Sequence, residues 1–89
     1  MAVGEEKIAK NRIITDRFLD VMYHLIGKRV IRNKKEFAEA VGLASSNLYR
    51  MELEKSMNVP LYAIENAYHE FGTNPIYIIT GEGEMIINR

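Results

Sequence analysis

Residues 34–52, KKEFAEAVGLASSNLYRME, contain two short helical patterns with a glycine between them. Apolar residues recur three or four positions apart within each pattern, namely Phe37, Ala38, Val41, Leu48 and Met51. Spacing of this kind places side chains on one face of a helix. Gly42 interrupts the pattern where a left-handed turn can form, because glycine adopts a positive φ without steric cost. The stretch therefore predicts two helices joined by a tight turn, a helix-turn-helix.

The second helix of this pair has a polar face. If Leu48 and Met51 seat the helix on the core, four side chains remain outward: Ser46, Asn47, Tyr49 and Arg50. Their chemistry suits base edges, since arginine can chelate guanine, asparagine can pair with adenine and serine can hydrogen-bond to several bases. Tyr49 can reach a phosphate or pack on a thymine methyl group. We therefore predict that this face enters the DNA major groove and reads bases.

Composition limits the chain to one small domain. Its 89 residues, 47% of them hydrophobic, can form a single core. The absence of cysteine excludes a disulfide framework, a zinc–thiolate site and cysteine catalysis, and it fits a reducing compartment. No apolar run approaches the roughly 20 residues of a membrane span, and the first ten residues lack the apolar core of a signal peptide. We therefore expect a cytoplasmic protein.

Basic residues are concentrated before the first motif helix. The net charge is zero, but residues 1–35 hold nine Lys or Arg against four acids, and residues 36–89 hold three against eight. Five residues between positions 28 and 35 are basic: Lys28, Arg29, Arg32, Lys34 and Lys35. Such a run is usually a solvated loop, but this one adjoins a helix N-terminus, which already favours phosphate. We therefore predict that Arg32, Lys34 and Lys35 contact the DNA backbone.

The first three predicted helices have recognisable ends. One extends over Thr15–Ile26, with its first residue as N-cap, and Gly27 ends it. Residues 1–14 form either a loose arm or an extension of this helix. The Asn33–Glu36 pair resembles a capping box at the start of the second helix. Ser45 is the expected N-cap of the third.

Two further helices complete an all-α set of five. Asn58-Val59-Pro60 opens the fourth, because proline suits the first helical turn, and Gly72 ends it. Its expected core-facing residues are Leu61, Ile64, Tyr68 and Phe71. Asn74-Pro75 opens a short fifth helix in the same way. We expect the folded domain to span residues 15–83, followed by a tail at 84–89.

Two segments together resemble the lambda-repressor-like (XRE-type) helix-turn-helix domains of phage repressors and bacterial transcriptional regulators. The first is EFAEAVGL at 36–43 followed by SSNLYRME at 45–52, and the second is FGTNPIYIITGEGEM at 71–85. The resemblance extends from about Arg17 to Met85. It implies a compact five-helix fold in which the second and third helices form the motif. It also implies a bacterial or phage-encoded DNA-binding repressor.

The resemblance implies roles for individual residues. In the family, the starts of both motif helices and the loop after the second contact phosphate, which assigns this role to Lys34, Lys35, Ser45, Lys55 and Asn58. Three departures from the family pattern stand out. Lys34 replaces the usual Gln, Thr or Ser, residues 53–56 contain no glycine, and Tyr49 is bulkier than the usual small polar residue. The outward face therefore does not specify which bases are read.

The C-terminal end is rich in large apolar residues: Ile76, Ile78, Ile79, Met85, Ile86 and Ile87. A short helix and tail of a small domain cannot bury all of them, and an exposed apolar patch indicates association. The last helix also mediates dimer contact in some members of the resembled family. We therefore predict a homodimer, which fits two-fold operators, with contacts from Ile76, Ile79, Met85 and Ile86.

Two classes of function fit these features. The first is a sequence-specific duplex-DNA-binding regulator. The second is a protein-interaction module of the same fold, as in antitoxin-like relatives, which the neutral charge and the apolar tail favour. For Arg50 itself, the alternative to base reading is an ion pair with Glu54, four residues on. No catalytic set, phosphate-binding glycine loop or metal-ligand spacing stands out, so we expect no enzyme, cofactor, metal or small-molecule ligand. Affinity that falls steeply with salt distinguishes the first class from the second.

Overall fold

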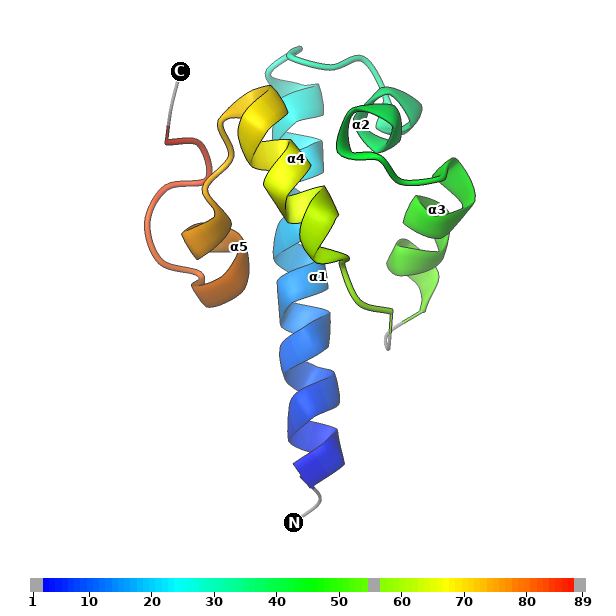
Figure 1. Ribbon diagram of the computed structural model, residues 1–89, viewed down its shortest axis with the longest axis vertical. Helices are drawn as coiled ribbons and strands as arrows, with labels where there is room; N and C mark the ends of the chain where they lie inside the picture. The colour runs from blue at the N-terminus through cyan, green and yellow to red at the C-terminus, as the bar shows by residue number, and fades with distance from the viewer. Residues whose placement is uncertain (1–2, 55–56, 88–89) are drawn as a thin grey trace.

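Five α-helices make up the described fold. The computed structural model describes residues 3–54 and 57–87, with side chains from residue 9 onward. In chain order the helices are α1 (Val3–Gly27), α2 (Lys34–Val41), α3 (Ser45–Leu53), α4 (Leu61–Phe71) and α5 (Pro75–Thr80). These residues contain no β-strand beyond one isolated bridge, and no helix long and apolar enough to cross a membrane. The predicted all-α class is therefore confirmed, and the other helices gather around the C-terminal part of α1 (Figure 1).

Helix α1 is longer than the sequence predicted. It has 25 residues, and its first turns project beyond the other helices (Figure 1). The prediction of Thr15 as N-cap is wrong, because this residue is fully buried inside the helix. Its hydroxyl donates to the carbonyl oxygens of Asn11 and Met57, each at 2.9 Å. Threonine commonly caps helices, but here tertiary packing gives its hydroxyl hydrogen-bond partners inside the helix. Residues 3–14 therefore extend α1.

The predicted ends of the later helices are largely confirmed. The Asn33 side chain accepts a hydrogen bond of 2.9 Å from the Glu36 amide and caps α2. Gly42, Gly72 and Gly81 follow α2, α4 and α5 with φ values of 83°, 71° and 82°. Each of these helices therefore ends in a left-handed residue that glycine adopts without strain.

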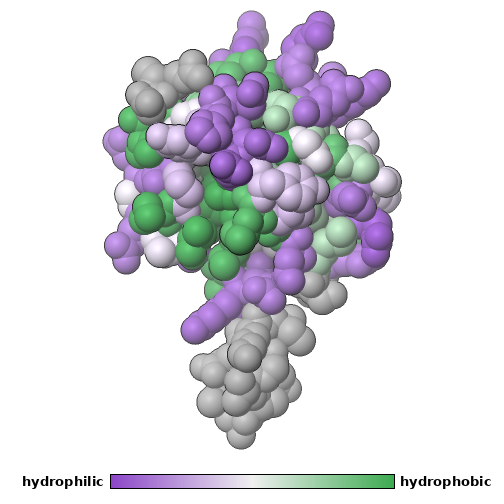
Figure 2. Space-filling view, viewed as in Figure 1, coloured by the Kyte–Doolittle hydropathy of each residue, from purple (hydrophilic) through white to green (hydrophobic). Residues whose placement is uncertain are grey.

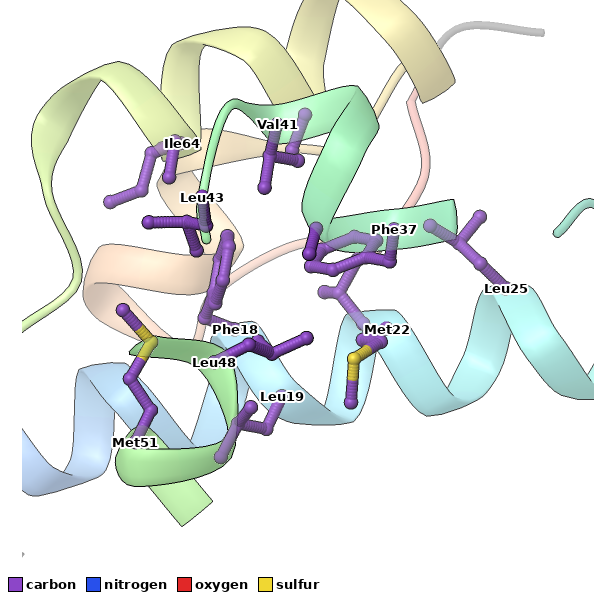
Figure 3. Close-up of a cluster of buried hydrophobic side chains, with 14 of the residues drawn as sticks. Phe18, Leu19, Met22, Leu25, Phe37, Val41, Leu43, Leu48, Met51 and Ile64 are labelled. Carbon is purple, nitrogen blue, oxygen red and sulfur yellow. The ribbon is translucent and has the colours of Figure 1, made fainter. Parts of the chain in front are cut away.

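The core lies where α1, α2, α3 and α4 meet. Figure 3 shows side chains from these helices pointing toward one another. The ring centres of Phe18 and Phe37 are 5.3 Å apart, and those of Phe37 and Phe71 are 5.9 Å apart. Leu48 and Met51 are buried as predicted, so α3 is seated on the core by its apolar side.

The buried side of α4 differs from the prediction. Its buried residues are Ala63, Ile64 and Ala67. Leu61 and Tyr68, which were predicted as core-facing, are exposed, and Phe71 is half-buried. The sequence pattern gave weight only to large apolar residues, whereas short alanine side chains let α4 pack closely against α2.

The C-terminal tail folds back on the domain. Ile86 forms an antiparallel bridge with Thr73, and the Asn74 amide donates to the Met85 carbonyl at 2.7 Å. Met85 and Ile86 are half-buried and pack against the core. These two predicted dimer contacts therefore take part in the packing of the domain itself.

Replacing Gly42 with Ala should destabilise the domain. A Cβ at this position would lie 3.3 Å from Nδ2 of Asn66, which donates to the Val41 carbonyl at 2.9 Å. Because φ is 83°, we expect a loss of about 1–2 kcal/mol in the free energy of unfolding. Gly27→Ala is the matched control, since no atom lies within 4 Å of a Cβ there. Urea denaturation measures both variants, and an equal effect at the two positions would contradict a strained turn at Gly42.

Candidate nucleic-acid interface

Helix α3 presents a polar face on the outside of the molecule. Figure 1 shows α3 at the periphery, away from α5. Of the predicted base-reading residues, the exposed ones are Ser46, Tyr49 and Arg50. Tyr49 is the largest of these three side chains, and 63% of its surface is accessible. Asn47 is half-buried at the margin of the face. Three of the four predicted side chains can therefore meet a partner directly.

A shallow hollow lies beside this face, where α2 begins next to α3. Its volume is about 280 Å³, and its lining residues are Lys34, Lys35, Ser45, Leu48, Tyr49 and Glu52. Three predicted phosphate contacts, contributed by two helices, thus surround one space. Two ammonium groups and a hydroxyl in such an arrangement can hold an oxyanion through charge-assisted hydrogen bonds.

The N-terminus of α3 opens at the same hollow. Ala44 is the N-cap and provides no side-chain oxygen, so the prediction of Ser45 as the cap is wrong. The Ala44 carbonyl already accepts hydrogen bonds from the amides of Asn47 and Leu48, at 3.0 and 3.1 Å, which makes Ser45 the first residue of the helix. A helix start without a capping side chain leaves backbone N–H groups that favour an anion. Ser45 therefore contributes to the hollow from the first turn.

Lys34 is held in a cluster of three side chains from three helices. Its Nζ donates to both carboxylate oxygens of Glu52, at 2.9 and 3.2 Å. The same nitrogen lies 5.2 Å from the centre of the Tyr23 ring, and the Tyr23 hydroxyl donates to the Glu52 carboxylate. We call Tyr23, Lys34 and Glu52 the lysine cluster. It joins α1, α2 and α3 at the edge of the hollow.

The lysine cluster shifts two pKa values. The Tyr23 side chain and then the Glu52 carboxylate stabilise the ammonium and raise the pKa of Lys34. Partial burial favours the neutral form of Glu52, but hydrogen bonds from Tyr23 and Lys34, with the charge of Lys34, outweigh it and lower the pKa of Glu52. Both groups are therefore charged at neutral pH. The Glu52 side chain is 21% exposed and that of Lys34 is 49% exposed, so solvent screens part of the attraction.

Two further predicted DNA contacts are paired with glutamates. Nε of Arg50 lies 3.2 Å from Oε1 of Glu54, so the alternative ion pair is present in the structure. Nη2 of Arg32 lies 3.4 Å from Oε2 of Glu36. Both are exposed pairs four residues apart, which contribute little to stability and open easily. A phosphate or a base edge can therefore displace either glutamate.

The end of α3 is tied to α1. Nη1 of Arg12 donates to the carbonyl oxygen of Met51 at 2.9 Å, across the gap between the two helices. After α3 the backbone of Glu54 is extended, with a φ of −100°. Lys55, a predicted phosphate contact, lies outside the described residues, and Asn58 is exposed in the following loop. The extension of α1 thus fixes the C-terminal end of the candidate reading helix.

No family model, curated protein or solved structure matches this chain. Within the described part of the chain, no three His, Asp or Glu side chains cluster as metal ligands do. His24 is half-buried, and Nε2 of His69 lies 3.9 Å from Oε2 of Glu65.

Sequence reasoning missed the residues that hold the interface in place. Tyr23 and Glu52 are 29 positions apart, and Arg12 and Met51 are 39 apart. No local pattern links positions at such separations, because they meet only when α1 packs beside α3. The one feature of the sequence that could have pointed to these contacts was an acidic residue, Glu52, at the end of the predicted reading helix.

Glu52 should lose its contribution to stability in acid. The folded-state pKa of Glu52 lies below its ordinary value of 4.5, so the carboxylate stabilises the fold above that value, and this contribution is lost as the pH falls through the folded-state pKa. We expect Glu52→Gln to lower the free energy of unfolding at about pH 7, and by less at about pH 3. Urea denaturation at both pH values measures the difference, with Glu39→Gln on the exposed side of α2 as the control. An effect of Glu52→Gln that is independent of pH would contradict the charged pair.

Proposed function

We propose that this chain is a sequence-specific double-stranded DNA-binding transcriptional regulator of the lambda-repressor-like type, and that it acts as a repressor. The observation that carries the proposal is the convergence of Lys34, Lys35 and Ser45 on one hollow beside the exposed face of α3. Phosphate contacts fix the orientation of a protein on DNA, and an adjacent polar helix reads the bases. In this chain the hollow that suits a phosphate lies next to the polar face of α3, as the two roles require.

Helix α3 has the dimensions of a reading helix. It has nine residues, and the major groove of B-DNA, about 12 Å wide, admits one α-helix. Arg50 exchanges the Glu54 carboxylate for O6 and N7 of a guanine, while Ser46 and Tyr49 contact neighbouring bases. Asn47, half-buried, reaches only a base or phosphate at the margin of the contact. Leu48 and Met51 keep the helix seated on the core throughout.

The basic edge supplies the affinity that does not depend on sequence. A phosphate enters the hollow between Lys35 and the first turn of α3, and Arg32 approaches the next phosphate along the strand. Contacts of this kind release counterions from DNA, so they weaken as salt rises. Asn58, exposed in the loop after α3, offers a further backbone contact on the other side of the helix.

A homodimer is the second part of the proposal. Ile76 and Ile79 of α5 are 56% and 45% exposed, and Ile13 of α1 is 46% exposed. Ile79 and Ile13 line one hollow of about 400 Å³ between the two helices. Figure 2 shows hydrophobic surface gathered over α5 and the adjacent part of α1. We assign the dimer contact to this α1–α5 face, without Met85 and Ile86, which pack against the core of the domain itself.

A module that binds a protein partner is the alternative function. The observation that favours it is the pairing of three predicted DNA contacts with glutamates, in a chain of zero net charge. Surfaces with mixed, paired charges suit a protein partner as well as DNA. The salt dependence of binding distinguishes the two functions, because only DNA binding releases a condensed counterion layer.

Selection of duplexes from a random pool at near-physiological salt should enrich a two-fold-symmetric sequence. Arg50→Ala should then lose about 1–3 kcal/mol of discrimination at one base pair in each half-site. Lys35→Ala should weaken all duplexes alike and reduce the steepness of the salt dependence by about one unit. Titration of labelled duplexes at several salt concentrations measures both effects.

The matched control for these variants is Tyr68→Ala, because Tyr68 is exposed near the C-terminal end of α4, outside the interface. Unchanged discrimination by Arg50→Ala would show that α3 does not read bases with this residue. Absence of any enriched sequence, with no salt-dependent binding, would favour the partner-binding module.

The double variant Ile76→Glu/Ile79→Glu should be monomeric. Burying unpaired carboxylates at the dimer contact costs about 3 kcal/mol or more, which raises the dissociation constant roughly 100-fold. Analytical ultracentrifugation measures this, with Leu61→Glu as the control, since Leu61 is 79% exposed but lies on α4. A wild-type protein that is monomeric at high micromolar concentration would contradict the dimer.

A further inference from the structure

The lysine cluster differs from the other ion pairs of the candidate interface. Arg32–Glu36 and Arg50–Glu54 each join residues four positions apart, and the Arg32 side chain is 87% exposed. Lys34 and Glu52 instead belong to different helices and are 18 positions apart. The side chain of Glu52 is only 21% exposed, and the Tyr23 hydroxyl of α1 binds the same carboxylate. The Glu52 carboxylate is therefore held from two other helices. Glu36 is held only by the side chain and the backbone amide of Arg32, four residues away, and Glu54 by the side chain of Arg50.

The Glu52 carboxylate binds Lys34 with the chemistry of a phosphate. Its carboxylate accepts two hydrogen bonds from Nζ of Lys34, as a phosphate oxygen pair would. It also lines the hollow where Lys35 and Ser45 converge. An oxyanion of the protein itself thus satisfies one of the predicted phosphate contacts before any DNA arrives.

We propose that Glu52 competes with the DNA backbone for Lys34, and so suppresses binding to duplexes that offer only phosphates. The inference rests on the proposed DNA-binding function and deepens it. On DNA of arbitrary sequence Lys34 stays with Glu52 and releases no counterion. A sequence that also satisfies α3 holds the backbone against the hollow, where a phosphate displaces Glu52 from Lys34. Because this contact forms only in the specific complex, the ratio of specific to non-specific affinity rises. Glu52 is then a specificity-determining residue that touches no base.

The experiment is a double-mutant cycle on a duplex of random sequence. Wild-type protein, Glu52→Gln, Lys34→Gln and the double variant are titrated with fluorescent duplex over a range of salt concentrations. Glu52→Gln should make the slope of log K against log salt steeper by about 0.9, the value for one additional phosphate contact. Between 1 M and about 0.15 M salt that slope corresponds to about fivefold tighter binding.

The Lys34→Gln background distinguishes competition from simple repulsion. If Glu52 acts through Lys34, Glu52→Gln has no effect on either affinity or slope once Lys34 is Gln. If Glu52 only repels the DNA, the gain in affinity is the same in both backgrounds, and the proposal is overturned. Glu52→Asp is a second test, because it keeps the negative charge but shortens the reach to Lys34. It should tighten non-specific binding, whereas repulsion alone predicts no change.

Circular dichroism of each variant verifies that the fold is kept, and Tyr23→Phe reports the effect of losing the hydroxyl alone. That variant frees the Glu52 carboxylate from α1 but leaves its charge beside Lys34, so its salt slope should lie between those of the wild type and Glu52→Gln. Failure of the inference and failure of the proposed function give different results. Wild-type binding that Glu52→Gln leaves unchanged overturns the competition only. No salt-dependent binding by the wild type or by Glu52→Gln overturns both.

Discussion

The position of α3 depends on how α2 ends. The amide of Leu43 donates to the Ala38 carbonyl at 2.8 Å and that of Gly42 to the Glu39 carbonyl at 3.4 Å, so the chain turns sharply at Gly42. Asn66 of α4 donates to the Val41 carbonyl at 2.9 Å and holds the same turn from outside. Because the turn is fixed, the rotation of α3 about its own axis is fixed as well. Leu48 therefore points into the core, and Tyr49, one residue later, points to solvent.

Helix α1 connects the two faces on which the proposed function depends. Arg12 donates to the C-terminal end of α3, and Nη1 of Arg17 donates to the Ile79 carbonyl at the end of α5, 3.0 Å away. Guanidinium groups suit these positions, because the last carbonyls of a helix lack intrahelical donors and carry partial negative charge. The candidate reading helix and the candidate dimer helix are thus attached to one scaffold. A fixed distance between them is what a dimer needs to meet two half-sites at a constant spacing.

Charge at the candidate interface is arranged in pairs. The basic run at 28–35 gives the impression of a strongly positive edge, yet the structure joins Arg32, Lys34 and Arg50 to glutamates. Two of those pairs are exposed and open readily, whereas the Lys34–Glu52 pair is supported by Tyr23 from a third helix. An oxyanion can reach these three cations only by displacing a carboxylate. In the proposed DNA-binding function, the same pairs weaken the attraction to arbitrary DNA and strengthen the discrimination among sequences.

The sequence by itself determined the helices, their glycine ends at Gly42 and Gly72, and the burial of Leu48 and Met51. These features depend on spacing within a few residues, which a chain displays directly. Only the tertiary structure decided that Thr15 lies inside α1 and that Ala63 faces the core. It alone brought Tyr23 and Glu52 to Lys34, because these contacts join positions 11, 18 and 29 apart on three helices and form only when the helices pack. Local sequence patterns predict the helices and their buried sides, whereas the packing of the helices decides which charged side chains meet.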